Sequence, residues 1–248
     1  LRVELFGGLR VTTASGREIR ITARKAQALL VCLALRPGAA VARDYLAGLL
    51  WDETDAELAR ASLRQALAAI RRCLPEAAAT ALVTDTNALA LDAALASSDV
   101  QQFRELVRDG SPHSLAEAAE RFDGELLPGF DARSAAFDAW LDEHRRALRR
   151  EWSQALQRAA TQCRSAGDLE GATAALTRLV AIEPANEAAQ RDLMEVFARR
   201  GLHTEALRQY RVCIDALRRD LDVAPEPATE ALYRDILRRR RGTIPGDD

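Results

Sequence analysis

The 248-residue chain carries 35 Lys and Arg against 37 Asp and Glu, a formal net charge of −2, with 48% hydrophobic and 29% charged residues. This is the composition of an ordinary globular protein, with a length that allows two domains. The charge excludes a generally polycationic protein, so any nucleic-acid contact must come from a local patch. The longest apolar run, residues 28–35, is far short of the roughly 20 residues that span a bilayer. Because no basic-then-apolar leader is present either, we expect a cytoplasmic protein with no membrane partner.

The residues that usually carry chemistry are scattered. The cysteines are far apart, each within an apolar helical pattern, and read as reduced core thiols: Cys32, Cys73, Cys163 and Cys213. The histidines show no metal-ligand spacing: His113, His144 and His203. The sequence contains no phosphate-binding glycine loop and no nucleophile elbow. We therefore expect no enzyme, no metal and no cofactor.

The chain begins with a strand pattern. Residues 1–5 and 9–14 alternate apolar and polar side chains around the turn at 7–8, which predicts a hairpin. Residues 18–21 read as a third short strand. Thr22 can then cap a first helix, which ends at 36–38.

Two further helices follow. The second runs over about 43–51, and the third over 59–74. In the third, one face is apolar: Leu63, Leu67, Ile70 and Leu74. At about 100° per residue, three arginines line up beside that face, namely Arg60, Arg64 and Arg71, while Gln65 and Arg72 point further round. The strip suits DNA phosphates, although a solvated face is the common alternative.

Short strands at 81–84 and 88–91 surround the turn at 85–87. Strands, three helices and a hairpin form the order of a winged helix, in which the third helix enters the major groove and the hairpin is the wing.

The runs RKAQALLVCLALRPG, VARDYLAGLLW and ARASLRQALAAIRRCL resemble the OmpR-type winged helix of bacterial activators of the antibiotic-regulatory-protein (SARP) class. The resemblance implies a DNA-binding domain over residues 1–96. By position it implies DNA contacts from five residues: Arg43, Trp51, Ser62, Gln65 and Arg71. The chain departs from this pattern in having no basic residue at 68–69 or at 85–87, and residues 1–96 hold 12 basic and 10 acidic side chains.

From residue 99 the pattern is nearly all helical. Helices are predicted from 99 to about 109 and over 115–122, with a loop at 122–130 and a long helix from Phe137 towards Cys163. A last helix covers 226–239.

The second half repeats itself. Three pairs of residues stand 34 positions apart: Gly167 and Gly201, Ala172 and Ala206, and Leu176 and Tyr210. That period is typical of tetratricopeptide repeats, stacked pairs of antiparallel helices. We expect the first helices of these pairs at about 152–165 and 186–200.

The second half also resembles a known family, the bacterial transcriptional activation domain (BTAD). The resemblance lies in three stretches: FDGELLPGF, WLDEHRRALRR and PANEAAQRDLMEVFARRGLHTEALRQYRVCIDALRRDLDVAPEPATEALY. We expect this domain over residues 97–241, with a linker or tail at 242–248. The expected fold class is mainly α with a small β component, an N-terminal winged helix-turn-helix followed by an all-α tetratricopeptide-like repeat domain.

Two functional hypotheses remain open. In the first, the chain is a transcriptional regulator, an activator by resemblance, that binds double-stranded DNA as a homodimer. Arg60, Arg64 and Arg71 would then meet phosphates and bases, and Arg43 and Arg72 would clamp the backbone. The repeat domain would hold RNA polymerase subunits or a second copy, and a C-terminal sensor or effector domain is expected outside this chain. In the second, the DNA-binding domain is degenerate and the chain is a protein-interaction and signal-relay module that uses the concave face of its repeats.

Overall fold

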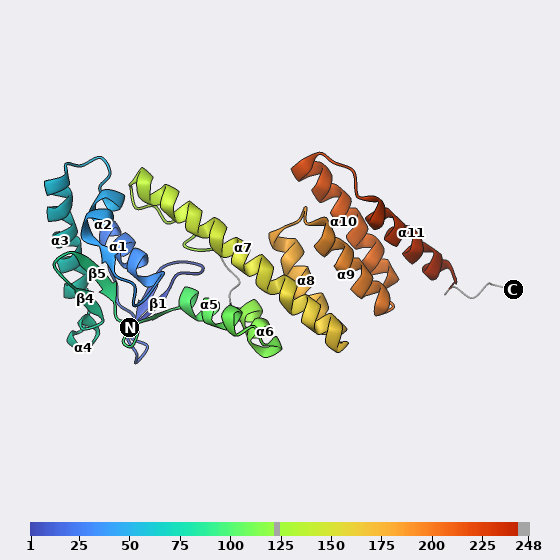
Figure 1. Ribbon diagram of the computed structural model, residues 1–248, viewed down its shortest axis with the longest axis horizontal. Helices are drawn as coiled ribbons and strands as arrows, with labels where there is room; N and C mark the ends of the chain where they lie inside the picture. The colour runs from blue at the N-terminus through green and yellow to red at the C-terminus, as the bar shows by residue number, and fades with distance from the viewer. Residues whose placement is uncertain (122–124, 243–248) are drawn as a thin grey trace. The chain divides into compact units, whose positions relative to one another are not determined.

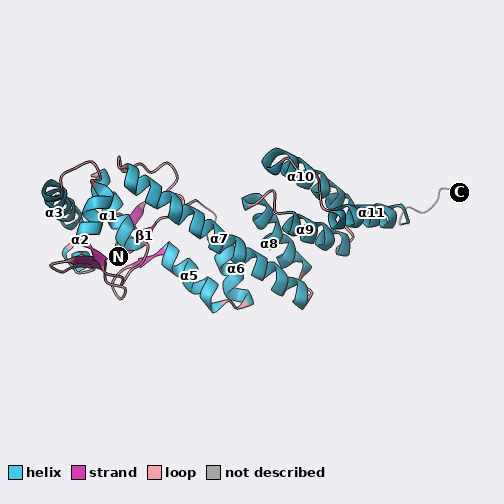
Figure 2. Ribbon diagram, turned by 45° about the horizontal axis from the view of Figure 1, so that its top comes forward, coloured by secondary structure: helices cyan, strands magenta, loops and turns pink. Residues whose placement is uncertain are grey.

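The computed structural model describes residues 1–121 and 125–242. Contacts divide the chain into two compact units. Unit 1 is Leu1–Arg108 with Phe122–Leu148, and unit 2 is Asp109–Arg121 with Arg149–Asp248. These units differ from the two domains expected from the sequence, residues 1–96 and 97–241. That domain boundary stays a prediction. The described strands all belong to unit 1 and to the first hundred residues of the chain, and Figure 2 draws them in magenta.

Unit 1 contains two small sheets. In the first, β1 (Arg2–Glu4) pairs antiparallel with β2 (Arg10–Thr12) and parallel with β6 (Ser97–Ser98). In the second, β5 (Ala88–Leu91) lies between β3 (Val41–Ala42) and β4 (Leu82–Thr84), antiparallel to both. The hairpins predicted at both places are confirmed.

Three helices form the centre of unit 1: α1 (Arg24–Ala34), α2 (Arg43–Leu50) and α3 (Ala56–Cys73). They pack against one another and bury their apolar faces, including Leu30, Leu46 and Leu63. The short α4 (Glu76–Ala79) follows, and α5 (Asp99–Asp109) adds the buried Phe103. The predicted order of strands, three helices and a wing is confirmed.

Three local predictions are wrong. Residues 18–21 form no strand, since only a single bridge joins Glu18 to Thr12, and the third strand of that sheet is β6. Thr22 does not cap α1, because the helix begins two residues later, with Ala23 at its N-cap and no side-chain bond there. Cys73 is exposed at the end of α3, whereas Cys32 is buried as expected.

The start of the long helix α7 (Ala135–Ala166) is held by the end of α2. Ser134 is buried, and its Oγ lies 2.7 Å from the carbonyl oxygen of Leu49 and 3.0 Å from Asp52 Oδ1. The second oxygen of Asp52 accepts a hydrogen bond from the Ala136 amide at 2.9 Å. Lys25 donates to the carbonyls of Leu50 and, at 2.9 Å, of Arg133. We call Lys25, Asp52 and Ser134 the α2–α7 junction.

The loop before α7 also belongs to unit 1. The Leu127 amide donates to the Leu5 carbonyl at 2.9 Å, and Leu126 forms a bridge with Phe6. Of the loop predicted at 122–130, residues 122–124 lie outside the described part of the chain.

Unit 2 contains α6 (Pro112–Arg121), the second half of α7, α8 (Leu169–Ile182), α9 (Glu187–Arg199), α10 (His203–Leu221) and α11 (Pro227–Gly242). From α8 to α11, each helix packs beside the next (Figure 1). No described helix of either unit is long and apolar enough to span a bilayer. The tail predicted at 242–248 lies outside the described residues except for Gly242, which ends α11.

The 34-residue period is visible in the turns and in the contacts. Gly167 and Gly201 end α7 and α9 with φ values of +78° and +75°. The contact of Gln157 with Asp192 at 3.4 Å recurs 34 positions later, where Arg191 contacts Glu226, the residue before α11, at 2.8 Å. The expected fold class, a winged helix followed by tetratricopeptide-like repeats, is therefore confirmed.

The positive φ at Gly201 leads to a stability prediction. Replacing Gly201 with Ala should lower the free energy of unfolding by about 1 kcal/mol, because a Cβ is disfavoured in left-handed backbone even where space is free. The control is Gly48→Ala, within α2 and also in open space, which should raise stability by about 0.5–1 kcal/mol. Urea unfolding followed by circular dichroism measures both, and an equal effect of the two changes would contradict the argument.

The α2–α7 junction gives a second prediction. The Ser134→Ala change leaves the Leu49 carbonyl of the last turn of α2 without its hydroxyl partner, and the free energy of unfolding should fall by about 1–3 kcal/mol. Ser165→Ala serves as control, since that exposed hydroxyl only bonds Thr161 within its own helix, and should change stability by less than about 0.5 kcal/mol. Thermal unfolding of both variants measures this difference in stability. A Ser134→Ala protein as stable as the control would refute the stabilising role of the α2–α7 junction.

Candidate nucleic-acid interface

The third helix has one buried and one exposed side. Asp55 caps α3 by accepting a hydrogen bond from the Glu57 amide at 2.9 Å, so the helix starts three residues before the predicted Ala59. The predicted apolar face is buried: Leu63, Leu67, Ile70 and the following Leu74. The burial of this face directs Arg60, Arg64 and Arg71 outward, and all three are exposed.

An open groove of about 600 Å³ lies where α2, α3 and the wing meet. Eight described residues line it: Ala42, Arg43, Asp44, Arg60, Leu63, Arg64, Thr86 and Asn87. The groove therefore brings together three of the predicted DNA-binding residues, Arg43, Arg60 and Arg64, from two helices.

Protein groups already hold three of the arginines. Arg60 Nε donates to Asp44 Oδ1 at 2.7 Å, a contact between α3 and the first turn of α2. Arg71 Nη2 donates to Thr84 Oγ1 on the wing at 2.7 Å. Arg43 Nε donates to the carbonyl oxygen of Asp85, also on the wing, at 2.8 Å. The side chains are thus ordered by neighbouring elements of unit 1.

The remaining predicted residues lie elsewhere on α3 and α2. Arg72 and Gln65 are exposed beyond the arginine strip, and Arg64 and Arg72 have no ion-pair partner among the described residues. Ser62 is half-buried at the opposite edge of the exposed side, since it follows Arg60 by about 200° of helix. Trp51 follows the last residue of α2 and lies outside the groove lining, with Lys25 Nζ 5.9 Å from its ring centre.

The wing contributes polar groups and an acid. Its tip holds Asp85, Thr86 and Asn87, and the Asp85 carboxylate accepts a hydrogen bond from the Thr86 amide at 2.6 Å. Asn87 accepts a hydrogen bond from the Arg43 amide through its carbonyl oxygen at 2.9 Å. The wing therefore positions Arg43 by its backbone and supplies no basic side chain of its own at the tip.

Sequence reasoning missed Asp44 and Thr84. The arginine strip of α3 has no acid within it, but the structure brings one from α2, sixteen positions earlier in the chain. Helical periodicity describes one helix at a time, so it could not pair Asp44 with Arg60 across two helices.

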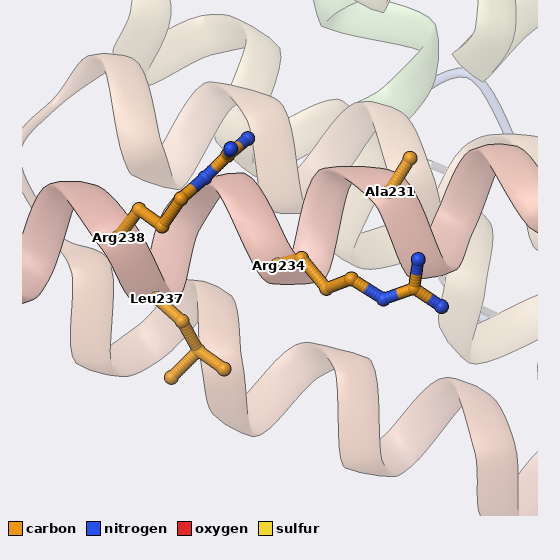
Figure 3. Close-up of a pocket in the computed structure, with 4 residues that line it drawn as sticks. All are labelled: Ala231, Arg234, Leu237 and Arg238. Atoms are coloured by element: carbon orange, nitrogen blue, oxygen red, sulfur yellow. The ribbon is translucent and has the colours of Figure 1, made fainter.

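A second basic surface lies on α11, in unit 2. A pocket of about 440 Å³ is lined by Ala231, Arg234, Leu237 and Arg238 (Figure 3). Arg234 pairs with Glu230 at 2.6 Å and Arg238 with Asp235 at 3.4 Å. Both arginines of the pocket already contact a carboxylate of α11, although Asp235 is shared with Arg239 at 2.6 Å. This surface is therefore a weaker candidate for phosphate binding than the groove.

The chain matches the family described as "bacterial transcriptional activator domain" over residues 91–237, more than half of its length. The chain belongs to this family. The predicted BTAD and SARP class is therefore confirmed, and the chain is a member of a family of transcriptional activators. The match starts in β5 and ends within α11.

Among solved structures, the chain is similar to Mycobacterium tuberculosis EmbR in complex with a low-affinity phosphopeptide, with a TM-score of 0.73 and 22% sequence identity. The similarity covers 100% of this chain and 66% of the EmbR chain, so this BTAD-family chain spans slightly less than two thirds of that relative. At this identity the likeness shows the fold alone. The comparison with curated proteins gave no match.

The ion pair between Asp44 and Arg60 predicts a pH dependence. The hydrogen bond and charge of Arg60 lower the pKa of the Asp44 carboxyl below its usual value. The pair is thus fully formed above the ordinary aspartate pKa and is lost as the pH falls through the lowered one. Carbon-detected NMR should give a midpoint for Asp44 below that of an ordinary aspartate, and Arg60→Gln should return it to the ordinary range. Equal midpoints in the two proteins would mean that the pair does not form in solution.

Proposed function

We propose that the chain is a transcriptional regulator that binds double-stranded DNA through α3, with the groove between α2, α3 and the wing facing the DNA. The observation that carries the proposal is the convergence of Arg43, Arg60 and Arg64 on one groove of unit 1. Guanidinium groups that neighbouring elements hold in place lose little freedom when they bind a phosphate or a base edge.

The roles of the individual side chains follow from their positions. Arg43 begins α2 and is tied to the wing, which suits a contact with the DNA backbone. Arg64 and Arg72 are exposed on α3 and have no ion-pair partner among the described residues, so their full charge is available to phosphates. Gln65, which is exposed on the same helix, is suited to pair with an adenine edge.

The charge of the region favours selective binding over strong non-specific binding. Residues 1–96 hold 12 basic and 10 acidic side chains, and this excess of two positive charges is small for a DNA-binding domain. One winged helix also offers a small contact area, so we propose that two copies bind repeated half-sites. The repeats of unit 2 would hold the second copy or a subunit of RNA polymerase, as the family membership suggests.

The test is selection of genomic fragments by the purified 248-residue chain at two salt concentrations, beside an Arg60/Arg64/Arg71→Ala variant. The wild-type chain should enrich fragments with a shared repeat. The variant should lose at least about tenfold in affinity for them, with a slope of log affinity against log salt shallower by about two to three units, because up to three phosphate contacts are lost.

The matched control removes three exposed arginines of α10, Arg208, Arg211 and Arg218, and so makes the same change in net charge on unit 2. It should bind the selected fragments like the wild-type chain. If the wild-type chain enriches no fragment even at low salt, DNA binding is refuted and the interaction-module hypothesis becomes the better explanation.

A further inference from the structure

The groove carries one acid among its described lining residues, and that acid is Asp44. Asp44 lies in the first turn of α2, beside Arg43, with its side chain 72% exposed. A carboxylate on a face that approaches DNA repels phosphates, and over distances shorter than about 8 Å salt screens this repulsion only in part. Its presence in the groove therefore needs a reason.

Folding stability supplies only a small part of that reason, because an exposed acid in the first turn of a helix interacts only weakly with the helix dipole. The side chains of Arg60 and Asp44 are 51% and 72% exposed, and ion pairs between exposed groups contribute little to folding. The cap of α3 comes from Asp55, and the packing of α2 on α3 comes from buried residues such as Leu46 and Leu63. The Asp44–Arg60 pair is therefore free to serve binding.

The geometry of the pair shows what it does to Arg60. Asp44 Oδ1 accepts a hydrogen bond of 2.7 Å from Nε of Arg60, the nitrogen nearest the aliphatic part of the side chain. The two terminal nitrogens of Arg60 have no hydrogen-bond partner among the described residues. A guanidinium held at Nε keeps its terminal N–H groups for a two-bond contact, the arrangement with which arginine binds the O6 and N7 atoms of guanine.

We propose that Asp44 determines the selectivity of DNA binding, orienting Arg60 towards a base edge and weakening contacts with phosphates at sites of the wrong sequence. This inference rests on the proposed function, since it concerns the DNA complex of the same groove. The orienting effect acts at the correct site, where Arg60 has a base edge to meet. The repulsion acts at every site, so its removal strengthens non-specific binding most.

Two substitutions separate the two effects. Asp44→Asn removes the charge but keeps an oxygen that can accept from Arg60 Nε, whereas Asp44→Ala removes both. The control is Glu18→Gln, which makes the same change in net charge at an exposed side chain, joined to β2 by a single bridge and outside the groove.

The measurement is fluorescence anisotropy of each 248-residue protein with a duplex selected by the wild-type chain and with a scrambled duplex, at 50 and 200 mM salt. For Asp44→Asn, binding of the scrambled duplex should have a salt slope steeper by about 0.9, and its affinity at 50 mM should rise about threefold relative to that at 200 mM. Asp44→Ala should in addition bind the selected duplex about two- to tenfold more weakly, because Arg60 is no longer held. Glu18→Gln should bind both duplexes like the wild-type chain, and all variants should unfold within about 4 °C of the wild-type temperature.

The outcomes distinguish the two proposals. If the wild-type chain selects a duplex and Asp44→Asn keeps the wild-type salt slope and selectivity, the role of Asp44 is refuted and the proposed function stands. An equal effect of Glu18→Gln would also refute it, because the cause would then be net charge alone. If the wild-type chain selects no duplex, the proposed function fails and this inference fails with it.

Discussion

The burial of Leu63, Leu67 and Ile70 is the constraint on which the candidate interface depends. Burying each such side chain stabilises the fold by roughly 1.5–3 kcal/mol, so α3 cannot turn about its axis without a large loss. With that orientation fixed, Arg60 and Arg71 lie at the edge of α3 where they meet side chains of α2 and of the wing, Asp44 and Thr84. The polar contacts of the groove are thus a consequence of apolar packing on the other side of the helix.

The α2–α7 junction connects the packed helices of the winged helix to residues that belong to the activator-domain match, which covers 91–237. Asp52 and Ser134 bind the backbone at the end of α2 and at the start of α7. Leu126 and Leu127 also pair with the N-terminal strand segment. Residues of the activator domain therefore complete the core of unit 1. A winged helix cut off at residue 96 would lose these contacts, so experiments on DNA binding should keep the whole chain.

Much of the fold could be predicted because its signals are local. The spacing of leucines in α3, the glycines at 167 and 201 and the turn at 85–87 each act over a few residues, and each predicted its element. The predicted strand at 18–21 failed for the opposite reason. Ile19 and Ile21 alternate and are buried, but β1 finds its second partner in β6, more than ninety residues later, and no local pattern contains that pairing.

The order of the elements, the 34-residue period and the strip of arginines on α3 can all be derived from the sequence, because helix periodicity, turn residues and the recurrence of residues at a fixed spacing follow the order of residues along the chain. The neighbours of those arginines depend on how the elements pack. In the folded chain Arg60 donates a hydrogen bond to Asp44, Arg71 to Thr84 and Arg43 to the Asp85 carbonyl. Such pairs form between elements that only packing brings together. The physical reason is that charge–charge and hydrogen-bond contacts depend on distances of a few ångströms, which sequence spacing fixes within a helix but not between helices.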